Sequence, residues 1–439
     1  MRDTRSTRTF FVIAATVALA VAGCTSGNSG SSASGGGNAN ATVPTTPVTL
    51  TWWHNGSAQP LLGLWQSVAD DYHKAHPNVT IKIDPLQNEQ FLTKVTAALQ
   101  TNDPPSIYQQ WGSGRMATEV TSGKVMDITQ AAAPWIGELN PKITVGWQQN
   151  GKQYGVPYDQ HAVGFWYRKD LFAQAGITTP PTTLDELNAD VVKLKAANIP
   201  AIAIGSKDRW PDAFYWDYFA VRECPTSVLK GSTDLKLNDP CWARAGNDLQ
   251  AFIATNPFQN AFLGTPAQTG AGSSAGMLAN GKAAMELQGD WEAVTMVSLT
   301  TDTNLTSKIG WFPFPAVPGG KGDPKVVLGG GDGFSCTTKA TGACVDFLKY
   351  ISSTPVQEKL AAAALVPVNE AAVGSITDPN VKENAQVLQN APYVQIYFDT
   401  SFPFTVGQAL DDAVANYFAG KGTPATIVQS VTQSASGGK

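Results

Sequence analysis

Several tryptophans in this sequence stand directly beside polar side chains. An indole presents a flat apolar face, while carboxylates, amides and guanidinium groups form paired hydrogen bonds. Together these groups suit a ligand with apolar faces and many hydroxyl groups, such as a neutral sugar held in a concave site. The candidate binding residues are Trp53, His54, Asn55, Gln87, Gln110, Trp111, Asp159, Asp208, Arg209, Trp210, Asp290, Trp291, Gly331 and Asp332.

The elements around these residues determine whether they can meet. β-rich runs at residues 48–53, 79–83 and 106–108 alternate with helical patterns at 61–76 and 89–99. The order β-α-β-α-β predicts a parallel sheet with helices on its faces. Most of the candidates follow a predicted strand or open a predicted helix, and ligands of such sheets bind beyond the carboxyl ends of the strands. Trp52 and Trp53 alternate along the first run, so one of them belongs to the core.

The second half of the chain is richer in helical patterns. They are expected at residues 184–197, 210–222, 243–255, 291–299, 344–351, 356–364 and 405–419, mixed with short strands near 153–158, 163–168 and 201–204. This mixture predicts a second α/β lobe. The run Gly329-Gly330-Gly331-Asp332-Gly333 allows close backbone approach. It suits a hinge, a ligand-binding loop or a simple turn, and Asp332 suits either a ligand hydroxyl or a turn cap.

The N-terminus has the pattern of an export signal. Three arginines precede an apolar run from residue 10 to residue 22, and that run is shorter than the roughly 20 residues that span a bilayer. It ends in Val-Ala-Gly-Cys at Cys24, which resembles a bacterial lipoprotein signal with Cys24 as the acylated mature N-terminus. The alternative is an ordinary signal peptide that is cut nearby. We therefore expect a leader at 1–23, a flexible tether at 24–46 and lipid anchoring outside the cytoplasmic membrane.

The remaining cysteines are Cys224, Cys241, Cys336 and Cys344. In an oxidising compartment four cysteines allow three pairings. The local pairing, Cys224 with Cys241 and Cys336 with Cys344, closes two short loops and is favoured. No CxxC spacing supports a zinc site, and we expect neither a metal nor a cofactor.

Composition restricts the class of protein. Charged residues make up 15 % of the chain, against about 25 % in an average soluble protein, and the net charge is −5. A nucleic-acid-binding protein would carry a basic face. Low charge density and the absence of a basic cluster favour a neutral ligand over a phosphosugar or a uronate, although Arg115 and Arg209 leave this open.

Several segments resemble, in order, the extracellular solute-binding proteins of carbohydrate ABC transporters, the group that includes maltose-binding protein. They are Leu50-Thr51-Trp52-Trp53-His54-Asn55-Gly56, His76-Pro77-Asn78-Val79, Tyr154-Gly155-Val156-Pro157-Tyr158-Asp159, Phe165-Trp166-Tyr167-Arg168-Lys169-Asp170-Leu171-Phe172, and Gly281-Lys282-Ala283-Ala284-Met285-Glu286 with Gly289-Asp290-Trp291.

The resemblance implies a periplasmic-binding-protein-like α/β fold, with two α/β lobes joined by crossing hinge strands. One lobe would hold residues 47–159 plus 332–390, and the other 160–331 plus 391–437. It also implies a monomeric binding protein without catalysis, which closes around a neutral oligosaccharide and delivers it to a permease. Trp291 lies at the position where the family often stacks on a sugar, and Asp159 lies at the crossover. The run from Gly329 to Cys336 looks like that of actinobacterial xylo-oligosaccharide binders, so xylobiose or xylotriose is the first candidate ligand.

Two other functions deserve comparison with this one. A secreted glycoside hydrolase also gathers tryptophans and two carboxylates in a cleft, and Asp159 with Asp290 fits those roles. Gly272-Ser273-Ser274-Ala275-Gly276 matches the nucleophile-elbow pattern, but no strand is predicted before it and no histidine follows it. A lipid-anchored structural module leaves the tryptophan clusters without a purpose.

Overall fold

The first elements of the chain alternate between strand and helix, as expected. The computed structural model describes residues 40–437, so the predicted leader, Cys24 and most of the tether lie outside the described residues. The order is β1 (Val48–His54), α1 (Leu61–Ala75), β2 (Val79–Pro85), α2 (Asn88–Leu99) and β3 (Ile107–Gln110). β1 pairs with β2 and β3 in parallel, which confirms the parallel arrangement.

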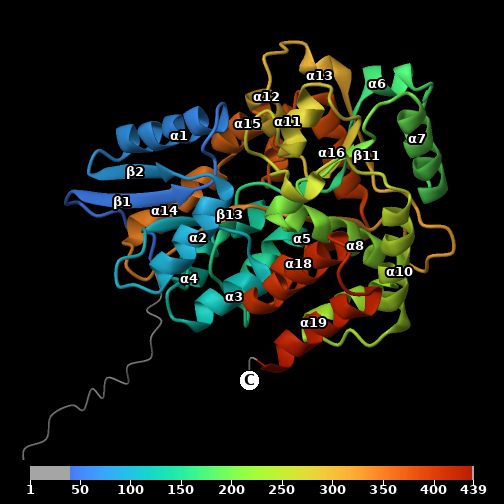
Figure 1. The fold of residues 1–439 in the computed structure, drawn as a ribbon. Helices are drawn as coiled ribbons and strands as arrows, with labels where there is room; N and C mark the ends of the chain where they lie inside the picture. Colours follow the sequence, from blue (N-terminus) through green and yellow to red (C-terminus); the bar gives the residue numbers. More distant parts are fainter. Residues whose placement is uncertain (1–39, 438–439) are drawn as a thin grey trace, which may run out of the picture. The chain divides into compact units, whose positions relative to one another are not determined.

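A strand from far along the chain completes this first sheet. β13 (Gly333–Cys336) lies between β3 and β6 (Val156–Pro157) and is antiparallel to both. The five strands run in the order β2-β1-β3-β13-β6. Figure 1 shows β1 and β2 with α1 on one side of the molecule. Strands from the first part and from the last third of the sequence therefore form one sheet.

A second sheet has the order β11-β8-β10-β9. Its strands are β8 (Gly164–Arg168), β9 (Ile202–Ala203), β10 (Met285–Gln288) and β11 (Ile309–Pro313). α8 (Trp210–Glu223) packs against α10 (Pro240–Ala254) and α18 (Phe404–Phe418), which packs in turn on α19 (Pro424–Gly437). Figure 1 shows this helical group opposite β1 and β2.

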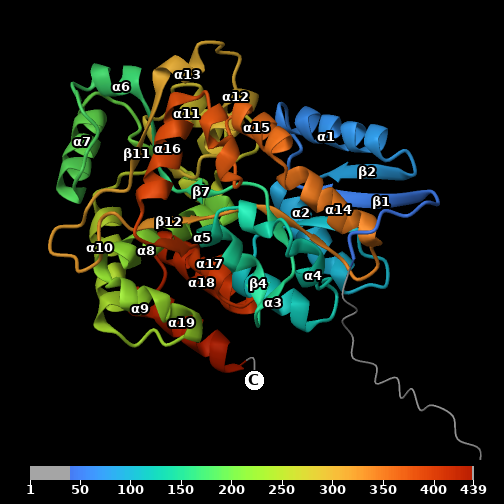
Figure 2. The same ribbon diagram turned by 180° about the vertical axis from the view of Figure 1, so that it is seen from behind.

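A third sheet joins strands from three distant segments in the order β14-β12-β7. They are β7 (His161–Ala162), β12 (Val327–Gly330) and β14 (Val394–Ile396). β12 fits against β7 because the two residues that pair with β7, Gly329 and Gly330, are glycines. A Cβ on Gly329 would lie 2.1 Å from the carbonyl oxygen of His161. Figure 2 shows β7 and β12 near the middle of the molecule. The lobe boundaries at 159/160, 331/332 and 390/391 stay a prediction.

The remaining elements fill the faces and the connections. The other helices are α3 (Ser113–Thr121), α4 (Thr129–Ala132), α5 (Pro141–Thr144), α6 (Lys169–Gln174), α7 (Leu184–Ala196), α9 (Thr226–Lys230), α11 (Ser274–Ala279), α12 (Glu292–Ser298), α13 (Leu305–Lys308), α14 (Gly342–Ser352), α15 (Thr354–Ala362), α16 (Pro379–Asn390) and α17 (Phe398–Ser401). A two-stranded hairpin pairs β4 (Gln148–Gln149) with β5 (Lys152–Gln153).

The apolar periodicity of the sequence corresponds to buried faces. In α1 the buried residues Trp65, Val68, Ala69 and Tyr72 repeat at a spacing of three to four, which places them on one side of the helix. In β1 the alternation buries Trp52 completely. Trp53 points to the opposite face of the sheet, and the Lys94 ammonium lies 4.2 Å from its ring centre. Trp52 is therefore the core residue of the pair.

Both expected disulfides are present. Cys224–Cys241 joins the end of α8 to the start of α10, and Cys336–Cys344 joins β13 to α14. Across residues 40–437 no helix combines the length and the hydropathy that crossing a bilayer requires.

Candidate functional site

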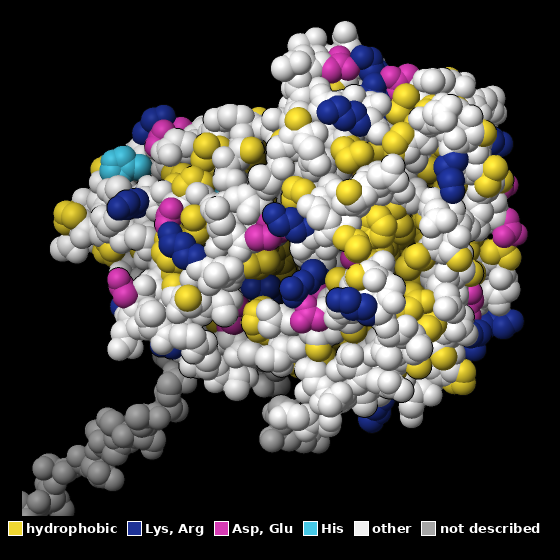
Figure 3. Space-filling view, in the orientation of Figure 1, with side chains coloured by type: hydrophobic (Ala, Val, Ile, Leu, Met, Phe, Trp, Pro, Cys, Tyr) yellow, Lys and Arg dark blue, Asp and Glu magenta, His cyan; other side chains and the backbone are white. Residues whose placement is uncertain are grey.

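A cavity of about 670 Å³ opens between loops of the first sheet and helices that follow the second. Figure 3 shows this face hollowed near its centre, with acidic and basic side chains around the hollow. Eight of the residues that the sequence predicts for binding line the cavity. They are Asn55, Gln87, Trp111, Asp159, Asp208, Trp210, Trp291 and Asp332.

Aromatic rings form one wall of the cavity. The ring of Trp291 lies 6.3 Å from those of Trp210 and Phe214 and 6.4 Å from that of Tyr397, between centroids. The segment Gly289-Asp290-Trp291 needs glycine at its first position, because a Cβ on Gly289 would lie 2.2 Å from the Trp291 indole. Glycine is thus needed for the indole to fold back over the end of β10. The wall provides flat apolar surface for the CH faces of a ring.

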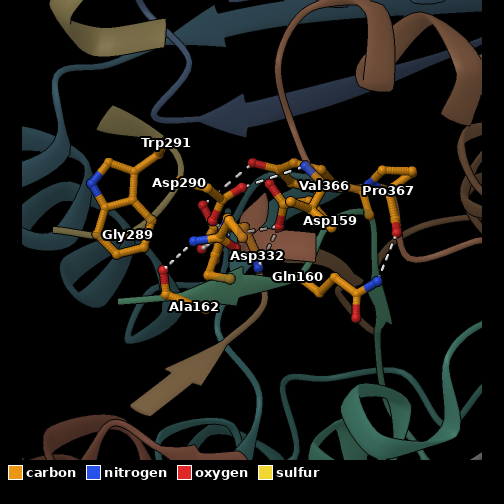
Figure 4. Close-up of polar contacts among 12 residues, drawn as sticks. Asp159, Gln160, Ala162, Gly289, Asp290, Trp291, Asp332, Val366 and Pro367 are labelled. Atoms are coloured by element: carbon orange, nitrogen blue, oxygen red, sulfur yellow. Dashed lines mark hydrogen bonds and ion pairs between the residues drawn. The ribbon is translucent and has the colours of Figure 1, made fainter. Parts of the chain in front are cut away.

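A buried ion-pair cluster lies beside this wall. His161 Nδ1 lies 2.8 Å from Asp290 Oδ1, and His161 Nε2 lies 3.1 Å from Asp159 Oδ1 and 3.7 Å from Asp332 Oδ1. The backbone N–H of Asp332 donates to Asp159 Oδ1 over 2.8 Å. Figure 4 shows Asp159, Asp290 and Asp332 gathered beside Trp291. Asp159 and Asp332 line the cavity, whereas His161 and Asp290 do not.

The electrostatics of the cluster follow from burial and from the neighbouring charges. Burial opposes the charge of His161, but the carboxylates of Asp159 and Asp290 outweigh it and raise the pKa of this imidazole well above its usual range. Burial also raises the pKa of Asp159 to about 7, although His161 opposes that rise. The imidazole is therefore a cation at neutral pH, and Asp159 titrates there.

The same cluster has the spacing of a cation site but not its chemistry. Donor atoms of Asp159, His161 and Asp332 lie within 4.8 Å of one another. However, both ring nitrogens of His161 face carboxylates. An imidazole protonated on both nitrogens has no lone pair for a metal. The contacts are those of an imidazolium held between carboxylates.

The other predicted residues do not line the cavity. Asp290 is fully buried against His161, and Gly331 packs its Cα on the carbonyl of Asp159. Arg209 is an exposed residue that pairs with Asp412. Gln110 is buried and donates to Glu119. Their roles in binding stay predictions. These contacts join them to other residues of the chain.

His54 shows how strand alternation separates neighbouring residues. Its ring is fully buried and lies 4.9 Å from that of Trp52, between centroids. Burial lowers the pKa of His54 to about 3, so the imidazole is neutral. Asn55, one residue later, lines the cavity. Trp53 is half-buried against the apolar cluster that contains Phe91 and Val95, on the other face of the sheet, and lies outside the cavity lining.

The structure adds cavity residues that the sequence reasoning missed. Arg115 lies in α3, with its guanidinium 5.0 Å from the ring centre of Trp111 and 4.9 Å from that of Phe404. Asp399 and Asp411 come from α17 and α18. The sequence pointed to Arg115 only as a cation that leaves a charged ligand open, although it follows Trp111 by four residues. Asp399 and Asp411 carry no local signal, since only the packing of α17 and α18 brings them to the cavity.

The serine motif is structural. Ser273 is the N-cap of α11 and accepts from the backbone N–H of Gly276 over 3.0 Å. Ser273 and Ser274 are fully buried, and a bend precedes them instead of a strand. A nucleophile elbow needs an exposed hydroxyl between a strand and a helix. The motif therefore caps a helix.

Curated relatives of this chain carry binding-protein names. Diacetylchitobiose binding protein DasA of Streptomyces coelicolor is 25 % identical over 356 residues, covering 78 % of this chain and 77 % of that protein. An uncharacterised ABC transporter extracellular-binding protein of Pyrococcus horikoshii is 23 % identical over 251 residues, covering 55 % of this chain. The match spans only 54 % of that Pyrococcus protein.

Solved structures share the fold. One from a study of xylan utilization by the thermophilic bacterium Caldanaerobius polysaccharolyticus superposes with a TM-score of 0.80 at 26 % identity, covering 88 % of this chain and 99 % of that one. A chitin oligosaccharide binding protein gives a TM-score of 0.78 at 23 % identity, covering 88 % of this chain and 98 % of that one. The expected fold of two α/β lobes with crossing strands is thereby confirmed.

A family model for the bacterial extracellular solute-binding proteins matches residues 56–358, which is well over half of the chain. This match covers all four of the motif segments that follow the first one, and it ends within the helical pattern expected at residues 356–364. The chain belongs to the family of bacterial extracellular solute-binding proteins.

Proposed function

We propose that this protein is the substrate-binding component of an ABC importer and captures a neutral oligosaccharide. The observation that carries the proposal is the cavity itself. It combines an aromatic wall of Trp291, Trp210 and Phe214 with the carboxylates of Asp159 and Asp332. Indole faces stack on the CH faces of a sugar, and carboxylates accept its hydroxyl hydrogens.

The mechanism we propose is hinge closure. Contacts across the cavity mouth support it, because Gln87 Nε2 donates to Thr269 Oγ1 over 3.1 Å and Trp210 Nε1 donates to Glu89 Oε1 over 3.4 Å. These pairs join the first-sheet side to the second-sheet side. A ligand that touches both sides only in the closed form shifts the population toward closure. The permease would then recognise the closed form.

Among oligosaccharides, xylobiose or xylotriose is the first candidate. The relative at 26 % identity comes from a study of xylan utilization, which supports a xylan-derived ligand. DasA is named for diacetylchitobiose, so chito-oligosaccharides are the second choice. A cavity of about 670 Å³ with several separate aromatic rings suits two or three sugar units better than one.

We further propose that the protein is a monomer, anchored through acylated Cys24 on the outer face of the cytoplasmic membrane. The sequence pattern at residues 1–24 supports the anchor. Catalysis is not part of the proposal. The pair that the sequence suggested for glycoside hydrolysis, Asp159 and Asp290, does not face a substrate together, since only Asp159 lines the cavity.

A thermal-shift screen tests this function directly. The purified protein is heated with xylo-, chito-, cello- and malto-oligosaccharides, their monosaccharides and a set of peptides. A ligand at 100 times its dissociation constant adds about 2.7 kcal/mol of stability, which gives a clear rise in Tm. We expect a rise with one oligosaccharide class and no release of reducing ends. A shift with peptides alone contradicts the carbohydrate proposal.

A further inference from the structure

His161 was not a candidate from the sequence, yet it lies at the centre of the buried ion-pair cluster. It begins β7, an edge strand of the three-stranded sheet β14-β12-β7. Its side chain is 1 % exposed, and those of Asp159 and Asp290 are 2 % and 0 % exposed. It reaches no part of the cavity itself. Any effect of His161 on a ligand must therefore pass through its neighbours.

The carboxylates around His161 have different partners. Asp290 Oδ1 lies 2.8 Å from Nδ1, and Asp290 Oδ2 accepts from the backbone N–H of Val366 over 3.4 Å. On the other side, Asp159 Oδ1 contacts Nε2 as an ion pair and also accepts from the backbone N–H of Asp332. Asp290 thus fixes Nδ1 from outside the cavity. The other ring nitrogen, Nε2, lies next to the carboxylates of Asp159 and Asp332, which line the cavity.

We propose that His161 is a positioning residue, a buried imidazolium that keeps the carboxylates of Asp159 and Asp332 charged and directed at the hydroxyl groups of the ligand. The inference rests on the proposed function and extends it to the control of that site by protons. A charged carboxylate accepts a hydroxyl hydrogen in a bond roughly twice as strong as a neutral pair makes. The ligand is then bound best when the carboxyl group of Asp159 has lost its proton.

The sign of the pH effect follows from the groups that face His161. The ionisable groups around it are Asp159, Asp290, Asp332, Tyr158 and Tyr397. No other cation stands among these groups, so the imidazolium is the charge that opposes protonation of Asp159. Without it, the pKa of Asp159 rises above its present value of about 7. Affinity therefore increases with pH in the native protein, and its midpoint moves to higher pH when the imidazolium is removed.

The test measures the dissociation constant of the best oligosaccharide by calorimetry between about pH 5.5 and pH 9, for the native protein and H161Q. The matched control is H76Q, because His76 is a partly exposed surface histidine 3.6 Å from Asp346. We expect H161Q to bind about tenfold more weakly at pH 7, with a midpoint moved by about one pH unit to the alkaline side. H76Q keeps the native profile.

A purely structural role of His161 predicts a different result. Affinity would then fall equally at every pH with an unmoved midpoint, and this outcome overturns the proposal. An unchanged affinity overturns it as well. If the native protein binds no oligosaccharide at any pH, the proposed function fails instead, so the two failures are distinguishable.

A second variant and a spectrum cover the case in which H161Q does not fold. D290N removes the carboxylate that holds Nδ1, and its negative charge also raises the pKa of Asp159, so this variant is expected to move the midpoint to lower pH, opposite to H161Q. Nitrogen-15 NMR of the four histidines reports their protonation directly. We expect one imidazole to stay doubly protonated through pH 8. A neutral His161 at pH 7 rules out the imidazolium and the proposal with it.

Discussion

Trp291 is the residue at which the aromatic wall and the ion-pair cluster meet. Its ring lies edge-on to that of His161, with centroids 4.9 Å apart, and partly faces the cavity. Truncation to alanine removes the stacking surface, so Trp291→Ala is expected to weaken oligosaccharide binding at least about tenfold. Calorimetry measures this change. Val297→Ala on α12, the helix that Trp291 precedes, is the control, since Val297 is half-exposed and outside the cavity lining.

The melting temperature of the unliganded Trp291→Ala protein separates two causes. Trp291 also packs against the apolar core of the second sheet. A small loss of Tm with a large loss of affinity supports direct ligand contact. Native affinity in the variant removes Trp291 from the site.

For single residues, the sequence predicted which types of side chain form the site better than it predicted which of them face the cavity. His54 ends β1 and Asn55 follows it directly, but alternation along the strand buries His54 and leaves Asn55 at the cavity. Asp290 and Trp291 separate in the same way after β10. The pattern identifies which loops carry the site. Which side chain of each loop faces the ligand depends on backbone geometry that a single sequence does not specify.

At the scale of elements, β10 and α12 bring together two buried carboxyl groups. Glu286 and Glu292 are nearly inaccessible, and within residues 40–437 both oxygens of Glu292 lack a hydrogen-bond donor. Burial raises the pKa of both groups, to about 8 for Glu286, and the charge of Glu286 raises the pKa of Glu292 further. The pair must hold a proton in the folded state at pH values where the unfolded chain has released it.

This pair predicts that the protein loses stability as pH rises from 5 to 8. A carboxyl with a raised folded pKa contributes stability at low pH that is lost between its unfolded and its folded pKa, at about 1.4 kcal/mol per pH unit for one proton. Glu292→Gln is expected to make this slope shallower. Urea unfolding at several pH values measures it. Glu358→Gln on the exposed face of α15 serves as the control, and an equal slope in all three proteins refutes the assignment.

The disulfide between α8 and α10 gives a second prediction for these elements. It closes a sequence separation of 17 residues. Chain-entropy arguments value a loop of this size at about 3 kcal/mol. The double variant C224S/C241S is therefore expected to lose about that free energy of unfolding, measured in urea against native protein. A loss below about 1 kcal/mol would indicate that the α8–α10 packing holds without the bond.

Long periodic elements were predictable, while short strands were not. α1 and α18 have a clear apolar face, and their predicted bounds lie within a few residues of the observed ones. β7, β12 and β14 have two to four residues each and pair across the whole chain. Such strands are too short for a periodic signal, and their partners are fixed by tertiary packing.

At the scale of the whole molecule, closure depends on contacts across the cavity mouth. Thr269→Val removes the hydroxyl that accepts from Gln87 while keeping the shape of the side chain. One lost hydrogen bond of about 1 kcal/mol lowers affinity about fivefold, chiefly through faster release. Stopped-flow measurement of dissociation checks this. Thr265→Val is matched, because that hydroxyl donates to Ala261 in its own loop, and an equal effect in both variants contradicts the closure contact.

The charge of the cavity sets which ligands are rejected. The described lining has five carboxyl groups, those of Asp159, Asp208, Asp332, Asp399 and Asp411, and one guanidinium, that of Arg115. A ligand that carries its own carboxylate meets like charge in a site of low dielectric. A glucuronate-containing disaccharide is expected to bind at least about 100-fold more weakly than its neutral counterpart, measured by competition. Comparable affinity would show that Arg115 governs the site.

The position of β13 has a consequence for how the chain is made. This strand occupies the interior of the first sheet, between β3 and β6, although more than 170 residues separate it from β6 along the sequence. While the chain is emerging from the ribosome, β3 has an open edge that nothing synthesised earlier can fill. The first sheet cannot close until residue 336 of the 439 is available, so its folding waits on most of the polypeptide. Until β13 is available, the unpaired edge of β3 stays open to pairing with other chains.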